Sequence, residues 1–393
     1  MSSASDVVIV GAGIVGAACA RECARRGLRT TVCDTNGIGG GATAAGMGHV
    51  VVMDDSPAQL ALTHYSQKLW HEVSGELTAQ VEFEACGTLW VAADEEEMGE
   101  VQRKRALYAS AGVKSEVLDS QALAEAEPHL RRPLPGALLV GSDVVLYPPA
   151  AAGHLMRDAM RMGARLETGH RVVSAGKGQV RLDNGTELHA GLVVNACGAD
   201  ATMLLPGLPV RKRRGHLVIT DRYPGFVRHQ LVELGYLKSA HSVAADSVAF
   251  NVQPRTTGQL LIGSSREFGA ETAAINHTLL AAMVARAQLF LPEIGDLQAI
   301  RVWTGFRAAT PDKLPLIGPW PEDDTLFLAT GHEGLGITTS LATARLLVAG
   351  MLREKAEIPA EPYLPGRFLQ GSGENGIGEQ SMSQVESPEG SHV

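Results

Sequence analysis

Three glycines and one acidic residue near the start of the chain have the types and spacing of a dinucleotide site. Gly11, Gly13 and Gly16 form the pattern GxGxxG. Asp34 follows the third glycine by 18 residues and can accept hydrogen bonds from the hydroxyls of a ribose. The glycines let a pyrophosphate approach the backbone and meet the amides that open the next helix. An ordinary strand–turn–helix without a nucleotide is the competing interpretation, although each part stands at its required place.

A second group of side chains that could bind a substrate lies mainly in the last third of the chain. Arg307 stands between Phe306 and Ala308 in a run that reads as a buried strand, RVWTGFRA, where a guanidinium needs an anion. Two parallel hydrogen bonds to a substrate carboxylate would fix position and orientation. A structural ion pair is the alternative. Further polar candidates for a substrate pocket, of types that are more often packed or at the surface, are His49, His216, His332 and Glu333.

Three expected strands would bring these residues together. The apolar runs 7–10, 191–198 and 326–330 each lead to a glycine, and helices are expected at 17–26 and 337–349. The second helix follows the glycine-containing loop 331–336, so a second helix N-terminus can face the same ligand. The loop 37–48 consists of glycine and small residues and can lie against a planar ligand, whereas the alternative is a flexible linker.

The order of these elements predicts an α/β fold of two domains. Residues 1–80, 146–214 and 309–368 are expected to form a Rossmann-like nucleotide domain around a parallel sheet. Residues 81–145 and 215–308 are expected to form a second, substrate domain around an antiparallel sheet. Residues 369–393 are nearly free of apolar side chains from about 371 onward, and we expect this tail to be disordered.

Charge and composition exclude several classes of partner. The formal net charge of −9 argues against nucleic acid or an anionic membrane as a main partner. The basic run 211–214 is too short for a nucleic-acid patch and indicates a solvated turn, an anion contact or a subunit contact. No apolar run reaches transmembrane length, and the cysteines lack the spacing of a metal site. We expect no bound metal and a cytoplasmic protein, with peripheral contact to the inner membrane through electron-acceptor partners as the alternative.

Together these motifs resemble the FAD-dependent D-amino acid oxidase superfamily. The similar segments run from residue 7 to about 340 and read GAGIVGAACA, GGGATAAGMGHV, VVNACGA, WTGFRAATPDKLPLIG and LATGHEGLGITTS. Within the superfamily the chain is similar to glycine oxidase and sarcosine dehydrogenase-like members. It is also similar to the β-subunits of bacterial D-hydroxyproline dehydrogenase and opine oxidase.

The resemblance implies a cofactor and a set of contact residues. It implies FAD rather than NAD, bound noncovalently because no cysteine stands near Ala308. It places Arg307 where glycine oxidase-like enzymes hold the substrate carboxylate, and it puts Gly334 where those enzymes often carry a second arginine. The candidate catalytic residues are Arg307, His49, His332 and Glu333. The candidate cofactor contacts are Gly11, Gly13, Ile14, Val15, Gly16, Asp34, Thr43, Ala44, Gly46, Met47, Gly48, Val172, Ala196, Gly198, Arg307, Gly331, Gly334, Leu335, Gly336 and Ile337.

The activity implied by the resemblance is oxidation of a small D-amino acid or secondary amine to the imino acid, by hydride transfer to flavin N5. The most specific expectation is cis-4-hydroxy-D-proline as substrate. The alternatives are a glycine, sarcosine or opine oxidase, including a cyanide-synthase subunit. A non-catalytic flavin subunit of a larger dehydrogenase complex and an NAD-binding protein also remain open. Besides the substrate, electron-transfer subunits or a second copy of the chain are the candidate partners.

Overall fold

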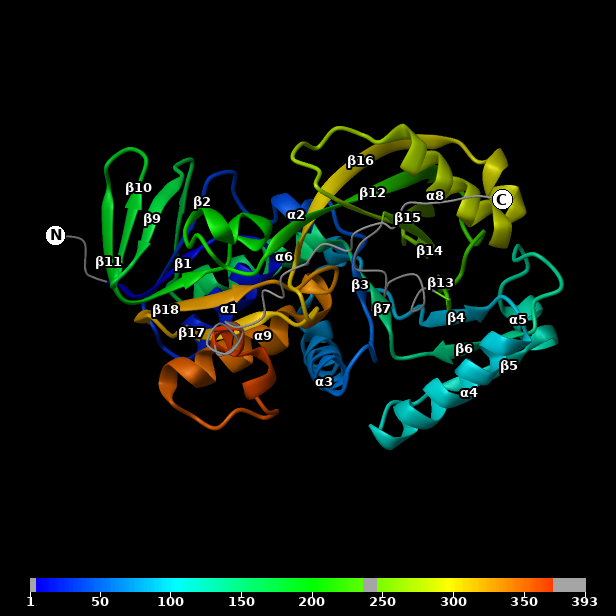
Figure 1. The fold of residues 1–393 in the computed structure, drawn as a ribbon, viewed down its shortest axis with the longest axis horizontal. Helices are drawn as coiled ribbons and strands as arrows, with labels where there is room; N and C mark the ends of the chain where they lie inside the picture. Colours follow the sequence, from blue (N-terminus) through cyan, green and yellow to red (C-terminus); the bar gives the residue numbers. More distant parts are fainter. Residues whose placement is uncertain (1–4, 236–245, 370–393) are drawn as a thin grey trace, which may run out of the picture.

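The computed structural model describes residues 5–235 and 246–369, and it contains two large sheets that lie at opposite ends of the molecule (Figure 1). The first sheet runs in the spatial order β17 (Leu316–Trp320), β18 (Asp323–Thr330), β11 (Glu187–Asn195), β1 (Ser5–Val10), β2 (Thr30–Asp34) and β8 (Arg165–Thr168). All neighbours in this order are parallel except β17 and β18. The hairpin β9 (Val172–Gly176) and β10 (Gln179–Leu182) extends from β11.

The second sheet is mainly antiparallel. Its spatial order is β16 (Ala299–Ala309), β12 (Arg211–Arg222), β15 (Gln259–Phe268), β14 (Ser247–Pro254), β13 (Gln230–Glu233), β4 (Thr88–Ala92), β6 (Gly136–Val140) and β5 (Glu116–Asp119). The pair β13–β4 is parallel. A short pair, β3 (His49–Val50) and β7 (Val144–Val145), forms a separate two-stranded sheet. The predicted α/β class, with a parallel nucleotide sheet and a second, antiparallel sheet, is confirmed.

Several helices begin at a side chain that caps the first turn. Ser56, Asp94 and Asn276 each accept a hydrogen bond from the backbone amide three residues on, at the starts of α3, α4 and α8. The α-helices are α1 (Ile14–Arg25), α2 (Gly41–Ala44), α3 (Pro57–Val73), α4 (Glu95–Ser110), α5 (Ser120–Ala126), α6 (Pro148–Arg161), α8 (His277–Phe290) and α9 (Gly336–Leu352). Short 3₁₀ helices span Ser74–Glu76, Ala79–Val81, Gly198–Met203, Pro292–Asp296, Glu361–Tyr363 and Pro365–Phe368.

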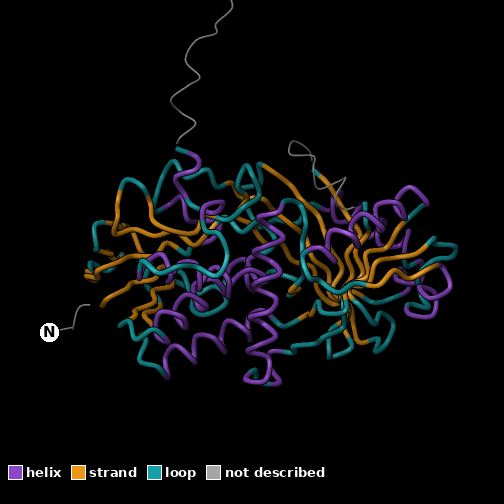
Figure 2. The backbone as a smooth tube through the Cα atoms, turned by 90° about the horizontal axis from the view of Figure 1, so that it is seen from below, coloured by secondary structure: helices purple, strands orange, loops and turns teal. Residues whose placement is uncertain are grey.

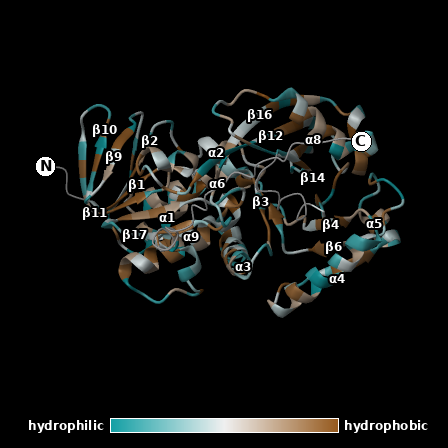
Figure 3. Ribbon diagram, in the orientation of Figure 1, coloured by the Kyte–Doolittle hydropathy of each residue, from teal (hydrophilic) through white to brown (hydrophobic). Residues whose placement is uncertain are grey.

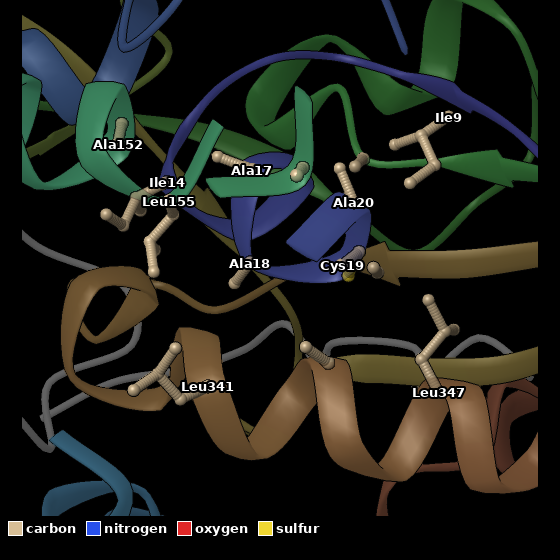
Figure 4. Close-up of a cluster of buried hydrophobic side chains, with 14 of the residues drawn as sticks. Ile9, Ile14, Ala17, Ala18, Cys19, Ala20, Ala152, Leu155, Leu341 and Leu347 are labelled. Carbon is tan, nitrogen blue, oxygen red and sulfur yellow. The ribbon is translucent and has the colours of Figure 1, made fainter. Parts of the chain in front are cut away.

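Small side chains on α1 let it pack closely against α6 and α9. Ala17 and Cys19 are fully buried, and Figure 4 shows Ala18 and Cys19 on the side of α1 that faces Leu341 and Leu347 of α9. Helices that pack together in this way lie along one side of the first sheet, as the view from below shows (Figure 2). This packing fixes the N-termini of α1 and α9 at the carboxyl ends of β1 and β18, where ligands bind in open α/β sheets.

Helix α8 covers one face of the second sheet and leaves the other face for a ligand. Phe290 of α8 stacks on Phe250 of β14, with 4.4 Å between ring centroids. Strands β4 and β6 are strongly apolar, whereas α4 alternates polar and apolar turns (Figure 3). Because side chains alternate along a strand, the neighbours of Phe250 point to the opposite face.

The basic run 211–214 was predicted to be a solvated turn, an anion contact or a subunit contact. The prediction of a solvated turn is wrong. The run begins β12, and Arg213 and Arg214 are only 5% and 8% exposed. Each has an acidic partner from a distant segment: Arg213 pairs with Glu333, and Arg214 with Glu267. These carboxylates allow two guanidinium groups to enter the interior, which the local sequence does not reveal.

The predictions of the domain boundaries, the disordered tail and the cellular location are not tested by the fold. The strands of the first sheet come from residues 5–34, 165–195 and 316–330, but the division into domains at the stated residue numbers stays a prediction. The predicted disordered tail lies outside the described residues from 370 onward. Within the two described ranges, none of the helices combines the length and the apolar character that crossing a membrane requires. The cellular location also stays a prediction.

Candidate active site

A cavity of about 660 Å³ has walls from both large sheets. Its wall on the first sheet includes the N-terminal glycine turn and Asp34, and its wall on the second sheet includes Trp90 and Asn251. The loop 332–337 and Arg307 lie along the same cavity. The structure therefore brings together the two groups of residues that the sequence places near opposite ends of the chain.

The glycine turn presents bare backbone to the cavity. Gly11 has φ +110°, and a Cβ there would lie 2.5 Å from the carbonyl oxygen of Ala196. A Cβ at Gly13 would lie 3.2 Å from Oγ1 of Thr43. Gly11 has no room for a side chain and Gly13 has little, so a ligand can approach the main chain here.

Asp34 is fixed at the cavity wall by backbone amides. Its Oδ2 accepts a hydrogen bond from Ala12 N at 2.8 Å. Its Oδ1 accepts hydrogen bonds from Asn36 N at 2.8 Å and Gly37 N at 2.9 Å. The carboxylate thus ties the glycine turn to the end of β2, and its other lone pairs are available to donors in the cavity.

Two helix N-termini meet the cavity, and both favour negative charge. The first turns of α1 and α9 contain no acidic residue, and Ile14, Leu335 and Ile337 line the cavity. Thr43 Oγ1 accepts the hydrogen bond of Ile14 N at 3.0 Å. Helix N-termini with exposed amides bind phosphates and other anions. The glycine turn, Asp34 and these two helices together fit a dinucleotide with a pyrophosphate, as in FAD.

Arg307 reaches across the second sheet from β16. Its Nη1 donates a hydrogen bond to the carbonyl oxygen of Ser265 at 3.0 Å. Its guanidinium occupies the space that a Cβ on Gly215 would need. A Cβ on Gly334 would lie 3.5 Å from Arg307 Nε, so a side chain at this position would adjoin the guanidinium. These contacts orient Arg307 along the cavity wall.

His49 is a neutral imidazole beside Arg307. Burial is the main reason that the pKa of His49 is lowered to about 4, and the charge of Arg307 lowers it further. A hydrogen bond with the backbone of Gly334 has the opposite, smaller effect. Its Nδ1 is buried and finds no hydrogen-bond partner among residues 5–235 and 246–369. His49 therefore brings an available nitrogen, without a positive charge, to the part of the cavity that contains Arg307.

His332 and Glu333 occupy the loop before α9 and have different surroundings. His332 is 7% exposed, and its Nε2 lies 2.9 Å from Thr343 Oγ1. Glu333 has φ +51°, its amide donates to Ala308 O at 2.9 Å, and its Oε1 accepts from Arg213 Nη1 at 3.1 Å. His332 packs against α9, whereas Glu333 adds a carboxylate to the cavity wall.

The protonation of His332 predicts how stability depends on pH. Burial lowers the pKa of His332 to about 3, so between about pH 6.5 and 3 the unfolded chain binds a proton that the folded protein does not. Stability should therefore fall with decreasing pH, and His332 should account for about 2 kcal/mol of the loss between pH 6.5 and 5. Urea unfolding of the wild type and His332→Gln at several pH values measures this. Equal losses in both proteins would contradict the prediction.

Most of the residues predicted from the sequence lie in the cavity wall. Besides the four catalytic candidates, these are Gly11, Gly13, Ile14, Val15, Asp34, Thr43, Gly46, Met47, Val172, Ala196, Gly198, Gly334, Leu335, Gly336 and Ile337. Gly16, Ala44, Gly48 and Gly331 lie outside the wall; a Cβ on Gly16 would clash with the carbonyl of Gly11, and one on Gly48 with that of Leu146. His216 also lies outside, bonded to Ser265 and Asn276. The contact of each residue with a cofactor stays a prediction.

Sequence reasoning missed the polar residues of the second sheet. Among the buried side-chain atoms of the cavity wall that lack a hydrogen-bond partner in the described part of the chain are four from the second sheet, Trp90 Nε1, Gln230 Oε1, Asn251 Oδ1 and Ser264 Oγ. They come from β4, β13, β14 and β15. A polar residue inside an otherwise apolar strand, as in SVAFNVQP, is the pattern that marks such a position.

Comparisons with known proteins agree with this geometry. The chain is 28% identical over 419 aligned positions to the hydrogen cyanide synthase subunit HcnC of Pseudomonas aeruginosa, covering 94% of this chain and 97% of that protein. It is 28% identical to glycine oxidase from the same organism, covering 92% of this chain and 99% of the relative. The crystal structure of glycine oxidase from Geobacillus kaustophilus superimposes with a TM-score of 0.83 at 25% identity, over 93% of this chain and 99% of that one.

The family model of the FAD dependent oxidoreductases called DAO matches residues 6–349. That range contains the glycine turn, Asp34, Arg307 and the loop before α9. FAD is the cofactor of this family, and the walls of the cavity fit it. The chain belongs to the DAO family of FAD-dependent oxidoreductases and is an enzyme of its amino acid oxidase and dehydrogenase group.

Proposed function

We propose that the enzyme oxidises the Cα–N bond of a small amino acid whose carboxylate is bound by Arg307. The observation that carries this proposal is the position of the Arg307 guanidinium, which lies over Gly215 and bonds to Ser265 O in the FAD cavity. A planar guanidinium binds a carboxylate through two parallel hydrogen bonds and so orients the adjacent carbon. Orientation of this kind accounts for much of the rate in such reactions.

The chain's own residues bind and orient the substrate. FAD, bound noncovalently, would supply the two-electron oxidant that accepts a hydride from the carbon bearing the amine. Arg307 neutralises the carboxylate. His49 is neutral above about pH 5 because burial and Arg307 lower its pKa to about 4, so its Nδ1 can accept a hydrogen bond from the substrate amine.

The relatives support glycine, N-alkylglycines and related amines better than the hydroxyproline interpretation. Glycine oxidase and HcnC are similar over more than 90% of the chain. cis-4-Hydroxy-D-proline is the second candidate. It is favoured by the buried amide oxygens of Gln230 and Asn251, which have no partner in the described ranges and can accept a hydrogen bond from a hydroxyl.

An anaerobic reduction assay tests the proposed function. The purified yellow protein is mixed without oxygen with glycine, sarcosine, iminodiacetate, D-proline and cis-4-hydroxy-D-proline, and loss of the visible flavin band is followed. We expect at least one α-amino acid to reduce the flavin within seconds, while the matched amines without a carboxylate, methylamine and pyrrolidine, do not. Reduction by the simple amines at the same rate would remove the carboxylate, and with it Arg307, from the proposal. A flavin that no member of the panel reduces would favour a non-catalytic flavin subunit.

A protein partner is a separate proposal. HcnC is by its name a subunit of an assembly. A partner subunit that accepts electrons, or a second copy of the chain, would accompany this enzyme in the same way. Admitting air after anaerobic reduction separates the cases, because slow reoxidation by oxygen would favour a partner acceptor.

A further inference from the structure

Two arginines lie directly opposite each other in the cavity wall. Arg213 of β12 pairs in register with Arg307 of β16, and both residues line the cavity. Arg266 of β15 also lines it. Like charges that face each other across neighbouring strands destabilise a sheet. The arrangement therefore needs negative charge close to it.

Arg213 is buried and incompletely satisfied by the protein. It is 5% exposed, its Nη1 donates to Glu333 Oε1 at 3.1 Å, and its guanidinium carbon lies 4.5 Å from the centre of the Phe268 ring. Its Nε and Nη2 have no hydrogen-bond acceptor in any residue that the structure describes. Leaving charged donors buried without acceptors costs more than leaving neutral ones.

The electrostatics at Arg213 point in the same direction. Burial lowers the pKa of Arg213; Arg266 and Arg307 lower it further, and Glu333 opposes them. In the proposed function one substrate carboxylate is bound to Arg307. That carboxylate neutralises Arg307. It leaves Nε and Nη2 of Arg213 without an acceptor, and a second anion would supply one.

We propose that Arg213, with Arg266 beside it, forms a subsite for a second anionic group of the substrate. The preferred substrates are then amines with two carboxylates. Neighbouring strands lie about 5 Å apart, which suits carboxylates separated by a short chain such as C–N–C. The two sources of this chemistry are N-carboxyalkyl amino acids and acidic α-amino acids. The inference rests on the proposed function for the carboxylate at Arg307.

Binding of unreactive analogues tests the subsite without turnover. Diglycolate carries two carboxylates on a C–O–C chain, and methoxyacetate is the matched analogue with one. Calorimetric titration of the FAD-loaded enzyme should give a diglycolate Kd at least about 10-fold lower, since hydrogen bonds to charged groups typically contribute that much. A diglycolate Kd equal to that of methoxyacetate in the wild type would overturn the proposal whatever the variants do.

Variants of β12 locate the effect. Arg213→Gln should raise the diglycolate Kd by about 10- to 100-fold and change the methoxyacetate Kd by less than about threefold. Arg213→Lys should retain part of the preference because it keeps the charge. Arg222→Gln is the matched control, since Arg222 is an exposed arginine at the other end of the same strand and outside the cavity. Equal weakening of both ligands in Arg213→Gln would make Arg213 a structural partner of Glu333 and overturn the proposal.

Flavin reduction then separates the two sources and the two proposals. Faster reduction by iminodiacetate than by sarcosine identifies N-carboxyalkyl amino acids, and faster reduction by D-aspartate or D-glutamate than by D-alanine identifies acidic amino acids. If sarcosine or D-alanine reduces the flavin as fast as every substrate with two carboxylates, the proposed function is retained and the second subsite is contradicted. A preference for diglycolate with no reduction by any amine would support the subsite and contradict the proposed function.

Discussion

Replacing Arg307 with Leu is expected to lower kcat/KM for amino acid substrates by about 100- to 1000-fold while FAD stays bound. The change removes a charge-assisted pair and leaves a substrate carboxylate in a largely buried cavity, a loss of about 3–4 kcal/mol. Most of the effect should appear in KM, because the carboxylate is bound in the ground state as well as in the transition state. Steady-state or stopped-flow flavin reduction over a range of substrate concentrations measures both constants.

Two further substitutions make this result specific to the guanidinium. Gly215→Ala should reproduce part of the loss, since a Cβ there takes the space that the Arg307 guanidinium occupies. Arg301→Leu is the control, because Arg301 is an exposed arginine of the same strand and lies outside the cavity. An unchanged KM in Arg307→Leu, with FAD retained, would show that the carboxylate binds elsewhere.

Gly11→Val is expected to abolish FAD binding. Gly11 has φ +110°, where a residue with a side chain is strained, and a Cβ would lie 2.5 Å from Ala196 O. Relief of that contact must move either the turn that meets the pyrophosphate or the end of β11. We expect a colourless protein with FAD affinity at least about 100-fold lower, because a displaced phosphate turn loses several charge-assisted hydrogen bonds at once.

The control for Gly11→Val is a glycine with similar backbone strain and open space. Gly27 has φ +77°, follows α1, and would have no atom within 4 Å of a Cβ. Gly27→Val should lower the unfolding free energy by about 1–3 kcal/mol without changing the ratio of flavin to protein. The ratio of visible to ultraviolet absorbance after purification, and titration with FAD, measure the difference. A yellow Gly11→Val protein with wild-type FAD affinity would contradict the role assigned to the glycine turn.

The basic run 211–214 shows where local reading fails. Four consecutive cationic residues in an acidic protein read as solvent-exposed, because burial of a guanidinium is costly unless an acid is present. The acids that permit the burial, Glu267 and Glu333, lie 53 and 120 residues away. No pattern within residues 211–214 indicates these acidic partners. The buried strand and the position of Arg213 in the cavity wall therefore become evident only from the assembled sheet.

The sequence by itself determined the nucleotide half of the site. The glycine turn, the first turn of α1 and Asp34 belong to one strand–helix–strand unit, and their chemistry depends on spacing within about 30 residues. The tertiary structure decided the other half. Period-two alternation puts Asn251 on the face opposite Phe250 and Trp90 on the same face as Thr88, but it does not say which face meets a cavity. That choice is made by α8 covering one face of the second sheet and by β12 and β16 bringing Arg213 opposite Arg307, which are contacts between segments far apart in the chain.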